Sequence, residues 1–422
     1  MLCGLIGEHL GHSFSPELHA LLGDYRYTLF ELAPDALEAF FRRTDWHGVN
    51  VTIPYKKAVI PYCDTLSDTA RRIQSVNTIV RDRQGRLHGD NTDYDGFCAM
   101  AAALGAPVAG KKALVLGSGG AGATVCAALR DLGASQVIPV SRSGPVTYEA
   151  AVRLHADAGL LVNATPVGMD PHNGVSPIGL ESFEALGGVL DLIYHPLRTA
   201  LLLDAQARGL PTENGLRMLA VQAAGSAELF TGAAIPPQRV EQVLRALIGA
   251  RENWVLVGMP GCGKTRTARL LAARTGRELL DTDAMVVART GKSIPQLFTQ
   301  EGEAAFRRLE AEAVAEAGAR TGVIIATGGG APLTEQNRRA LRQNGRVFWL
   351  RRALERLVRD GRPLSENLEA LRTMERIREP FYRACCDCEI DNNGAPEETA
   401  DRILSSENGV CVRRGAPGTS PA

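Results

Sequence analysis

Residues 113–122 read ALVLGSGGAG, so an apolar run leads directly into the pattern G-x-G-x-x-G at positions 117–122. A stretch rich in alanine follows and has the composition of a helix. Glycines at such a strand-to-helix turn let backbone N–H groups approach the pyrophosphate of a dinucleotide. A glycine cluster can also be a plain turn, and the pattern alone leaves both interpretations open.

Residues 258–265 read GMPGCGKT and form a second loop of different design, G-x-x-x-x-G-K-T, after the apolar run 254–257. In this pattern the Lys264 ammonium reaches the β- and γ-phosphates of a nucleoside triphosphate, and the Thr265 hydroxyl is a ligand for Mg²⁺. This spacing is far more specific than the first. The two loops therefore predict two different nucleotide chemistries in one chain.

The length and composition indicate a multidomain globular enzyme. A chain of 422 residues exceeds what one hydrophobic core usually organises, so we expect two or three domains, with a division near residue 250. Hydrophobic residues make up 45%, charged residues 22%, and the net charge is +0, which favours neither a nucleic acid nor a membrane as partner. No apolar run approaches the ~20 residues that span a bilayer, and residues 1–10 do not resemble a signal peptide. We therefore expect a cytoplasmic enzyme, and the sequence does not predict its oligomeric state.

The nine cysteines are an odd number spread along the chain, and we expect them to be reduced thiols. Cys385, Cys386 and Cys388 lie close together in the sequence. However, no histidine follows Gly209 and no second cysteine pair has a suitable spacing, which disfavours a zinc site. We interpret Cys262, inside the second loop, as a small residue that fills a loop position.

Short strand-like runs alternate with helical stretches in the first half, which predicts a parallel, doubly wound α/β architecture. The runs are residues 2–6, 49–53, 113–116, 136–140, 160–163 and 189–193. Helical periodicity resumes after residue 209 and indicates that the chain returns to its first lobe. We therefore expect five parts: a first α/β lobe of residues 1–100 and 210–249, an inserted Rossmann-like lobe of residues 101–209, a short linker at 250–253, a P-loop α/β domain with a parallel sheet at 254–406, and a disordered tail at 407–422.

The end of the second predicted strand of the inserted lobe bears on the choice of cofactor. A fold that binds NAD usually carries an acidic residue there, which accepts hydrogen bonds from the ribose hydroxyls. This chain instead reads Ser141-Arg142-Ser143. An arginine beside hydroxyl groups suits a 2′-phosphate, so these residues favour NADP, although an ordinary solvated arginine is the alternative.

Three polar clusters follow apolar runs upstream of the first glycine loop, at residues 12–16, 50–56 and 76–78 with 90–93. Taken separately, each cluster could consist of helix caps and turns. Their order and spacing, together with residues 163–169 and 214–223, resemble the shikimate dehydrogenase family over residues 1–248. The resemblance implies a two-lobed fold with the dinucleotide lobe inserted and the substrate between the lobes.

The resemblance also implies roles for individual residues. Lys56 and Asp93 fall on the catalytic positions. Reduction of a ketone delivers hydride to the carbon and a proton to the oxygen, and an ammonium held by a carboxylate can donate that proton while it stabilises the developing alkoxide. Ser13 and Ser15 fall on the positions that bind the substrate carboxylate. The positions around the substrate hydroxyls are Asn50, Thr52, Asn77, Tyr194 and Gln222, and those that bind NADP are Gly117, Ser118, Gly119, Gly120, Ala121, Ser141, Arg142, Leu192 and Gly215.

The second half carries a further ordered series of motifs at residues 279–283, 301–303, 306–310, 328–330, 362–364 and 378–382. A phosphoryl-transfer enzyme needs metal ligands, an acceptor site and close backbone approach, and this series resembles shikimate kinase from residue 254 to about 405. By that resemblance Asp283, Arg307, Gly329, Gly330 and Arg378 bind shikimate, and Asp283 is also catalytic with Lys264. ATP is bound by Gly261, Cys262, Gly263, Lys264, Thr265 and Arg362, and Mg²⁺ by Thr265 and, through water, by Asp281.

The sequence therefore predicts a bifunctional enzyme that reduces 3-dehydroshikimate with NADPH and then phosphorylates shikimate with ATP. Taken alone, Arg307 could be an exposed helical arginine that faces Glu303, and residues 328–330 could be a plain turn. Two functional alternatives stay open: a first half that prefers quinate and NAD, and a second half that senses nucleotides without catalysis. The joint presence of the catalytic candidates argues against the second alternative.

Overall fold

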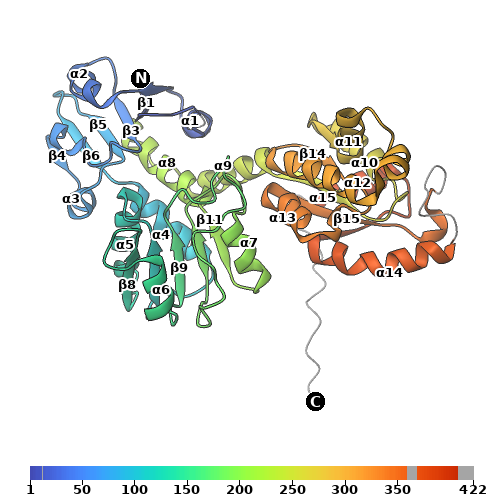
Figure 1. Ribbon diagram of the computed structural model, residues 1–422. Helices are drawn as coiled ribbons and strands as arrows, with labels where there is room; N and C mark the ends of the chain where they lie inside the picture. Colours follow the sequence, from blue (N-terminus) through green and yellow to red (C-terminus); the bar gives the residue numbers. More distant parts are fainter. Residues whose placement is uncertain (12, 359–367, 407–422) are drawn as a thin grey trace. The chain divides into compact units, whose positions relative to one another are not determined.

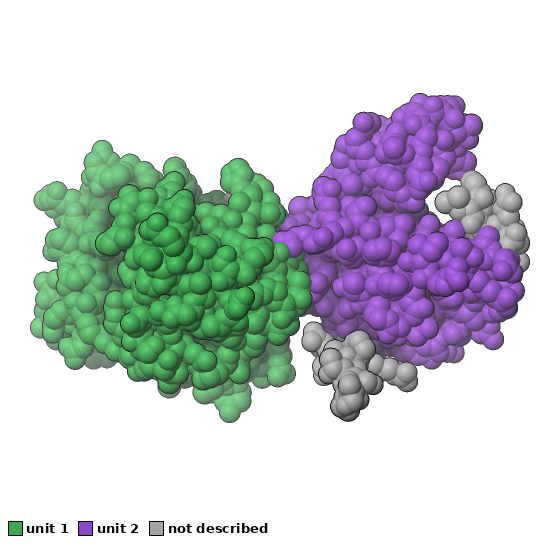
Figure 2. Space-filling view, turned by 60° about the horizontal axis from the view of Figure 1, so that its bottom comes forward, with its two compact units in different colours: residues 1–248 green, residues 249–422 purple. Residues whose placement is uncertain are grey.

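Short runs of aliphatic residues form three separate sheets, as the alternating pattern predicts (Figure 1). The computed structural model describes residues 1–11, 13–358 and 368–406. The chain divides between Ile248 and Gly249 into two units, drawn in different colours in Figure 2. The predicted disordered tail, residues 407–422, lies outside the described residues.

The first sheet is mixed and has the strand order β2-β1-β3-β5-β6-β4. Strand β3 runs antiparallel to β5, and β5 runs antiparallel to β6, so the parallel arrangement predicted for the first half is wrong for this part of the sheet. Strand β1 is parallel to both β2 and β3. Its core contains stacked aromatic rings, with Phe40 and Trp46 at a centroid distance of 5.5 Å. The strands are β1 (Leu2–Gly7), β2 (Arg26–Glu31), β3 (Gly48–Val51), β4 (Thr65–Leu66), β5 (Thr78–Arg81) and β6 (Leu87–Asp90), and the helices of this region are α1 (Ser15–Leu22), α2 (Leu37–Arg42) and α3 (Asp68–Ile73).

The second sheet is entirely parallel and has the strand order β11-β10-β9-β7-β8. Numbered from β7, this is the doubly wound order 2-1-3-4-5, which places the topological switch point between β7 and β9. The first glycine loop follows β7 at that point. The strands are β7 (Lys112–Leu116), β8 (Gln136–Val140), β9 (Leu160–Asn163), β10 (Val189–Asp191) and β11 (Thr212–Asn214), and the helices are α5 (Gly120–Asp131), α6 (Tyr148–Leu154) and α7 (Ala200–Ala207).

Two helices join the lobes of the first unit. The chain enters the second sheet through α4 (Asp93–Ala103) and leaves it through α8 (Leu216–Thr231), and these two helices pack against each other. Helix α8 also contacts α1 and β5 of the first lobe, and α9 (Pro237–Arg251) places Val243 and Leu247 in one apolar cluster with Leu18. The dinucleotide lobe is therefore an insertion, which confirms the predicted fold class.

The second unit is built on a parallel sheet with the order β13-β14-β12-β15-β16. Its strands are β12 (Asn253–Val257), β13 (Leu279–Asp281), β14 (Ile324–Ala326), β15 (Gly345–Arg351) and β16 (Cys388–Asp391). Its helices are α10 (Lys264–Thr275), α11 (Thr282–Thr290), α12 (Ile294–Ala319), α13 (Glu335–Asn344), α14 (Leu368–Cys385) and α15 (Pro396–Ser406).

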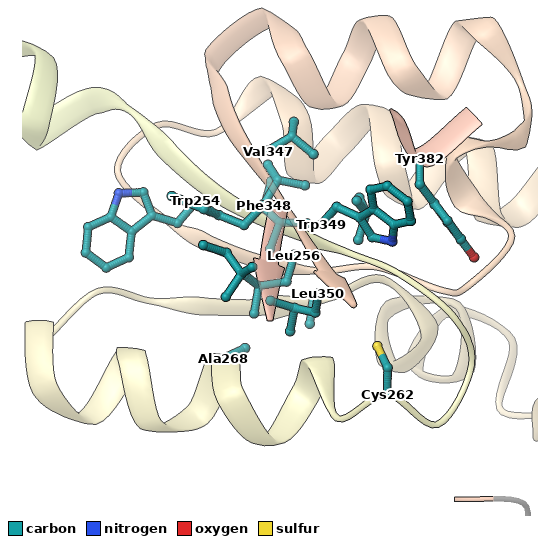
Figure 3. Packing of buried hydrophobic residues seen from close by; sticks show 14 of the residues in the cluster. Trp254, Leu256, Cys262, Ala268, Val347, Phe348, Trp349, Leu350 and Tyr382 are labelled. Carbon is teal, nitrogen blue, oxygen red and sulfur yellow. The ribbon is translucent and has the colours of Figure 1, made fainter. Parts of the chain in front are cut away.

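The central strand of this unit, β12, has no face exposed to solvent. All five residues of β12 are buried, because helices cover both faces of a parallel sheet. Figure 3 shows Leu256, Phe348 and Leu350 gathered between the strands and the helix that carries Ala268. The Cys262 side chain is buried at the edge of this cluster and shows no exposed surface, which agrees with its interpretation as a small filling residue.

The predicted strand bounds agree with the structure at β8 and β9, but β3 ends two residues earlier than expected. The chain turns after Val51, where the Tyr55 N–H donates to the Thr52 carbonyl at 2.9 Å. Within the described residues, no helix has the length and apolar character needed to cross a membrane.

The cysteines depart from expectation at one position. Among the described residues, seven cysteines are free thiols and Cys388 is disulfide-bonded, although the sequence predicts reduced thiols throughout. Burial raises the pKa of the Cys385 thiol to about 12 and that of the Cys386 thiol to about 11, so neither is an activated nucleophile.

Gln74 is expected to limit the stability of the first unit. It ends α3 with φ 57° and ψ 45°, and among the described residues it is the only non-glycine with positive φ. A side chain with a Cβ costs about 1–2 kcal/mol in this conformation, of which glycine's larger unfolded-state entropy cancels part. We expect Gln74→Gly to raise the free energy of unfolding by about 0.5–1 kcal/mol.

Hydrogen exchange at the buried amides of Val49 and Val51 measures this change, because core amides exchange through unfolding of the whole unit. Gln74→Ala is the matched control, since it removes the 2.6 Å hydrogen bond from the Gln74 side chain to the Arg71 carbonyl and keeps the Cβ. Slower exchange in Gln74→Ala than in Gln74→Gly would contradict the backbone explanation.

Candidate active sites

The Lys56 ammonium and the Asp93 carboxylate form a close ion pair in the first unit. Lys56 Nζ lies 2.5 Å from Asp93 Oδ2, and the two side chains are 17% and 8% exposed. Lys56 follows the turn after β3, and Asp93 is the first residue of α4. A buried carboxylate at this distance holds the cation in a fixed position, which a proton donor requires.

Amide side chains surround this ion pair. Asn77 Nδ2 donates to Asp93 Oδ1 at 2.9 Å and lies 3.5 Å from Gln222 Oε1 of α8. Asn50 Nδ2 donates to Ser226 Oγ at 2.7 Å and to the Asn77 carbonyl at 3.3 Å. The structure thus brings together Lys56, Asp93, Asn77, Gln222 and Asn50 from separate segments of the first unit.

The predicted carboxylate site lies on the loop before α1. Ser13 Oγ donates to Ser15 Oγ at 3.1 Å, so the two hydroxyls are neighbours. Burial raises the pKa of Tyr27, and a hydrogen bond with Ser15 acts against that shift. The Tyr27 hydroxyl donates to Asn50 Oδ1 at 2.8 Å, which connects the serine loop to the amides around Lys56.

Tyr194 approaches the serine loop from the dinucleotide lobe. Its ring lies 5.2 Å from the ring of Phe14, the residue between the two serines. Thr52, another predicted substrate residue, is half-buried at the end of β3, and its N–H donates to the Ile6 carbonyl at 3.0 Å. Within the part of the chain that the structure describes, the Thr52 side chain makes no hydrogen bond to the amides around Lys56.

The first glycine loop lies beside Lys56. A Cβ on Gly120 would lie 3.5 Å from Ser75 Oγ and 3.7 Å from Lys56 Cδ, so the start of α5 reaches the catalytic candidate. Gly117 has φ 111°, and a Cβ on Gly122 would collide with the Gly117 carbonyl. Positions 117 and 122 therefore require glycine, as expected for a backbone that cradles a pyrophosphate. The loop fits a dinucleotide.

The other predicted cofactor residues occupy the same edge of the second sheet. Ser141 and Arg142 directly follow β8, which pairs in parallel with β7, and the Arg142 side chain is exposed. A Cβ on Gly215 would collide with the Leu192 carbonyl, so these two residues are in contact. The carboxyl ends of parallel strands share one edge of a sheet. The four predicted cofactor residues therefore lie at the same edge as the glycine loop, and they are Ser141, Arg142, Leu192 and Gly215.

In the second unit, the P-loop encloses the ammonium of Lys264. Lys264 Nζ donates to the carbonyls of Gly258 and Met259 at 2.9 and 3.1 Å, and the residue is 7% exposed. Gly258, Gly261 and Gly263 all have positive φ, which glycine adopts without strain. The loop therefore forms the curved backbone that cradles phosphates.

Two carboxylates follow β13 beside this loop. Asp281 Oδ2 accepts a hydrogen bond from Thr265 Oγ1 at 2.7 Å, and Asp281 Oδ1 caps α11 by accepting from the N–H groups of Asp283 and Ala284. A hydroxyl and a carboxylate at this distance are oxygen ligands that suit Mg²⁺. Asp283 lies one residue into α11, and its Oδ1 would be 2.6 Å from a Cβ on Gly328.

The glycine run 328–330 meets the predicted acceptor residues. A Cβ on Gly330 would collide with the Arg307 guanidinium, and one on Gly329 would lie 2.7 Å from Pro260 Cγ of the P-loop. Arg307 Nη1 donates to Glu310 Oε2 at 2.8 Å, and Arg307 Nη2 donates to Glu303 Oε1 at 3.0 Å. The glycines leave room between the P-loop, Arg307 and Asp283.

Arg378 completes this cluster from α14. Arg378 is 8% exposed. Burial raises the pKa of both Tyr382 and Glu310, and the positive charge of Arg378 acts against that rise, so Arg378 lies near both groups. The Tyr382 hydroxyl donates to the Gly329 carbonyl at 2.6 Å and fixes the glycine run. Arg362, predicted to bind ATP, lies outside the described residues.

Sequence reasoning missed three residues that shape these sites. Glu310 is 2% exposed, its pKa is raised by burial, and it lies between Arg307 and Asp283. The i,i+3 spacing from Arg307 was an available signal for it. Tyr27 and Ser226 hold Asn50 from either side, but neither stands in a recognisable motif.

His19 is expected to make the first unit sensitive to acid. It is 1% exposed, stacks on Tyr27 at 4.0 Å, and contacts the Tyr25 hydroxyl through Nδ1 at 2.6 Å. Burial lowers its pKa to about 3, whereas an unfolded chain keeps a value near 6.5. Below pH 6.5 the unfolded chain binds a proton that the folded unit rejects, so stability falls by up to about 1.4 kcal/mol per pH unit between roughly pH 6.5 and 3.

We expect His19→Gln to flatten this dependence, measured as the shift with pH of the first unit's calorimetric transition. His9 is exposed and supplies the matched control, since His9→Gln leaves the buried ring in place. Parallel curves for His19→Gln and the unmodified protein between pH 6.5 and 4 would contradict the assignment to His19.

The fold and the two sites define the class of this protein: a two-lobed dinucleotide-dependent dehydrogenase followed in the same chain by a P-loop kinase. Residues 5–79 match the family model of the shikimate dehydrogenase substrate binding domain, and residues 260–407 match that of shikimate kinase. The chain belongs to the shikimate dehydrogenase family and carries a shikimate kinase domain behind the dehydrogenase.

Individual relatives agree with this assignment. The shikimate dehydrogenase (NADP(+)) of Synechocystis sp. is 35% identical over 274 residues, which cover 58% of this chain and 94% of that protein. The shikimate 5-dehydrogenase of Thermus thermophilus, solved in complex with NADP(H) and shikimate, matches with a TM-score of 0.53 and 36% identity over 58% of this chain and 99% of that one. The quinate dehydrogenase of Corynebacterium glutamicum, solved with NAD, matches with a TM-score of 0.52 and 28% identity over the same shares.

Proposed function

We propose that this chain catalyses two consecutive reactions: NADPH-dependent reduction of 3-dehydroshikimate to shikimate, and ATP-dependent phosphorylation of shikimate at its 3-hydroxyl. The chain is a bifunctional enzyme with a shikimate dehydrogenase and a shikimate kinase part. The observation that carries the proposal is the pairing of two sites suited to one cyclic hydroxy acid. One is the Lys56–Asp93 pair with its amides, and the other is the cluster of Asp283, Arg307 and Arg378 beside the P-loop.

In the dehydrogenase site, NADPH supplies the hydride that the ketone carbon receives. Lys56 donates its proton to the carbonyl oxygen as negative charge develops there, and Asp93 holds the ammonium in position. Ser13 and Ser15 donate hydrogen bonds to the substrate carboxylate. The substrate hydroxyls are bound by Asn50, Thr52, Asn77, Tyr194 and Gln222.

The preference for NADP rests on the exposed arginine after β8. Arg142 and Ser141 bind the 2′-phosphate, and the backbone at Gly117, Ser118, Gly119, Gly120 and Ala121 binds the pyrophosphate, with Leu192 and Gly215 beside the nicotinamide. We expect kcat/KM to be at least about tenfold higher with NADPH than with NADH, and Arg142→Ala to remove most of that difference. Faster turnover with NADH, or with quinate as the alcohol substrate, would contradict this assignment and favour the NAD-dependent alternative.

In the kinase site, ATP supplies the phosphoryl group that the 3-hydroxyl oxygen receives. Asp283 accepts a hydrogen bond from that hydroxyl and orients it in line with the phosphoryl group. Arg307 and Arg378 bind the shikimate carboxylate. Gly329 and Gly330 contact shikimate through their backbone. Lys264 stabilises charge on the phosphates together with Arg362, and Gly261, Cys262, Gly263 and Thr265 complete the loop. Thr265 would hold Mg²⁺ directly and Asp281 would hold it through water, because both offer oxygen ligands beside the P-loop.

We further propose domain limits that keep the predicted 1–100 for the substrate lobe and 254–406 for the kinase. The predicted limits 101–209, 210–249 and 250–253 need correction, because β11 (Thr212–Asn214) belongs to the dinucleotide sheet, α9 continues to Arg251 and β12 begins at Asn253. The partners are the small-molecule substrates, with neither nucleic acid nor membrane. The proposed location is the cytoplasm, where NADPH and ATP are both supplied.

The test follows NADPH loss and ADP formation together in one reaction that starts from 3-dehydroshikimate. We expect NADPH to fall first and ADP to appear after a lag, because the product of the first site is the substrate of the second. ADP formation without prior NADPH loss, or no ADP formation from added shikimate, would refute the proposal. The second result would favour a nucleotide-sensing module.

A further inference from the structure

Asp191 is a buried carboxylate for which the proposed mechanism has no use. It is the last residue of β10, has no exposed surface, and lies at the carboxyl edge of the second sheet. Three groups donate hydrogen bonds to it: the Ile193 N–H and Asn163 Nδ2, both at 3.0 Å from Oδ1, and Thr199 Oγ1 at 2.6 Å from Oδ2. A buried charge of this kind is costly unless it has a structural or functional purpose.

The hydrogen bonds of Asp191 connect two loops. Asn163 ends β9, and its Oδ1 accepts from both the N–H and the hydroxyl of Thr165 in the following loop. Thr199 caps α7, and its hydroxyl also accepts from the Leu202 N–H at 3.3 Å. Asp191 therefore ties the loop after β9 to both ends of the segment that runs from β10 to α7.

The segment between β10 and α7 carries two residues of the proposed dehydrogenase site, Leu192 and Tyr194. Its path is fixed at a second point, because the Gly215 N–H donates to the Ile193 carbonyl at 3.1 Å. Tyr194 contacts Phe14 of the serine loop, so this segment also reaches the substrate lobe. Helix α7, which follows the segment, packs against β10, which precedes it, and against β11 (Figure 1).

We propose that Asp191 is a positioning residue of the dehydrogenase site: its carboxylate sets the path of the β10–α7 segment and thereby places Leu192 at the nicotinamide and Tyr194 at the substrate. This inference rests on the proposed function of the first unit. An ionised carboxylate only accepts hydrogen bonds, which matches the three donors around it. Burial raises the pKa of Asp191 to about 7, and the three hydrogen bonds act in the opposite direction.

The first arm of the test compares Asp191→Asn with the unmodified protein. The variant keeps the shape of the side chain, but it offers one acceptor oxygen where the carboxylate offers two, so at least one of the three donors loses its acceptor. We expect kcat/KM for shikimate to fall at least about thirtyfold, with both kcat and KM affected. We expect ATP-dependent phosphorylation by the same molecules to stay unchanged, which controls for protein concentration and handling.

A double-mutant cycle separates positioning from a general loss of stability. If Asp191 acts through Leu192 and Tyr194, Asp191→Asn costs at most about threefold in a background that carries both Leu192→Ala and Tyr194→Ala. A full thirtyfold loss in that background would overturn the inference. Thr199→Val provides a second route to the same result, and Thr199→Ser, which keeps the hydroxyl, is expected to recover most of the activity that Thr199→Val loses.

Hydrogen exchange supplies a readout that does not depend on activity. The Ile193 amide donates to Asp191, so we expect its exchange to be at least about tenfold faster in Asp191→Asn, while the amides of β7 stay unchanged. Unchanged exchange at Ile193 would overturn the inference. If exchange responds but the unmodified protein does not oxidise shikimate, the proposed function fails while the role of Asp191 in fixing the segment stands.

Discussion

Lys56→Ala is expected to lower kcat for shikimate-dependent NADPH formation by about a thousandfold while it leaves ATP-dependent phosphorylation of shikimate unchanged. General acid catalysis contributes roughly 10²- to 10⁴-fold, and the charge of the ammonium adds electrostatic stabilisation of the developing alkoxide. The Lys56 ammonium lies 2.5 Å from the buried Asp93 carboxylate, which holds it in place. Stopped-flow absorbance of NADPH measures the loss directly.

The chain offers a matched control next to Lys56. Lys57 is exposed, and Lys57→Ala removes the same side chain one residue away. We expect that variant to retain most of the dehydrogenase activity. Asp93→Asn should resemble Lys56→Ala, because it removes the charge that orients the ammonium. A change in KM alone, or equal losses for Lys56→Ala and Lys57→Ala, would show that Lys56 is not the proton donor.

The sequence predicts much of the fold because local patterns determine it. The runs 136–140 and 160–163 coincide with β8 and β9, and the two glycine loops lie where a parallel strand ends and a helix begins. Gly122 and Gly263 are glycines for geometric reasons that a motif captures: a Cβ on the first would collide with the Gly117 carbonyl, and the second has φ 98°.

The contacts of the sites were beyond such patterns. Lys56 and Asp93 are 37 residues apart, and no spacing rule predicts that a turn after β3 and the start of α4 meet. Family resemblance supplied that pairing. Asp191 was missed because its importance comes from burial, which depends on the whole fold rather than on the residues beside it. Glu310 had a local signal in its i,i+3 spacing from Arg307, but its burial shows only in the fold.

Helix α12 shows how the structure refines a motif. The sequence around Glu301-Gly302-Glu303 indicates a lead into the helix that carries Arg307. In the structure, α12 (Ile294–Ala319) consists of two helical parts that meet at Gly302, where φ is 85° and ψ is 168°, so residues 301–303 lead into the part that carries Arg307. Glycine tolerates this conformation, and the kink sets the direction of the part that carries Arg307 and Glu310.

Lys264→Ala is expected to lower kcat/KM for ATP by about a thousandfold and to leave shikimate-dependent NADPH formation unchanged. The Lys264 ammonium lies within hydrogen-bond distance of the Gly258 and Met259 carbonyls and is nearly buried, so it is held where the phosphates bind. Its loss removes a positive charge that stabilises the transferring phosphoryl group. A coupled assay for ADP, together with the affinity for ADP in the absence of shikimate, measures the effect on turnover and on binding.

Lys292 is the other lysine of the second unit and provides the control. Its ammonium pairs with Glu301 at 2.6 Å, and Lys292→Ala removes an ordinary surface ion pair worth at most about 1 kcal/mol. We expect it to keep kinase activity within about threefold of the unmodified protein. If Lys264→Ala silenced both activities in folded protein, the two sites could not act independently. If Lys264→Ala lowered kinase activity no more than Lys292→Ala does, Lys264 would not be a phosphate-binding residue.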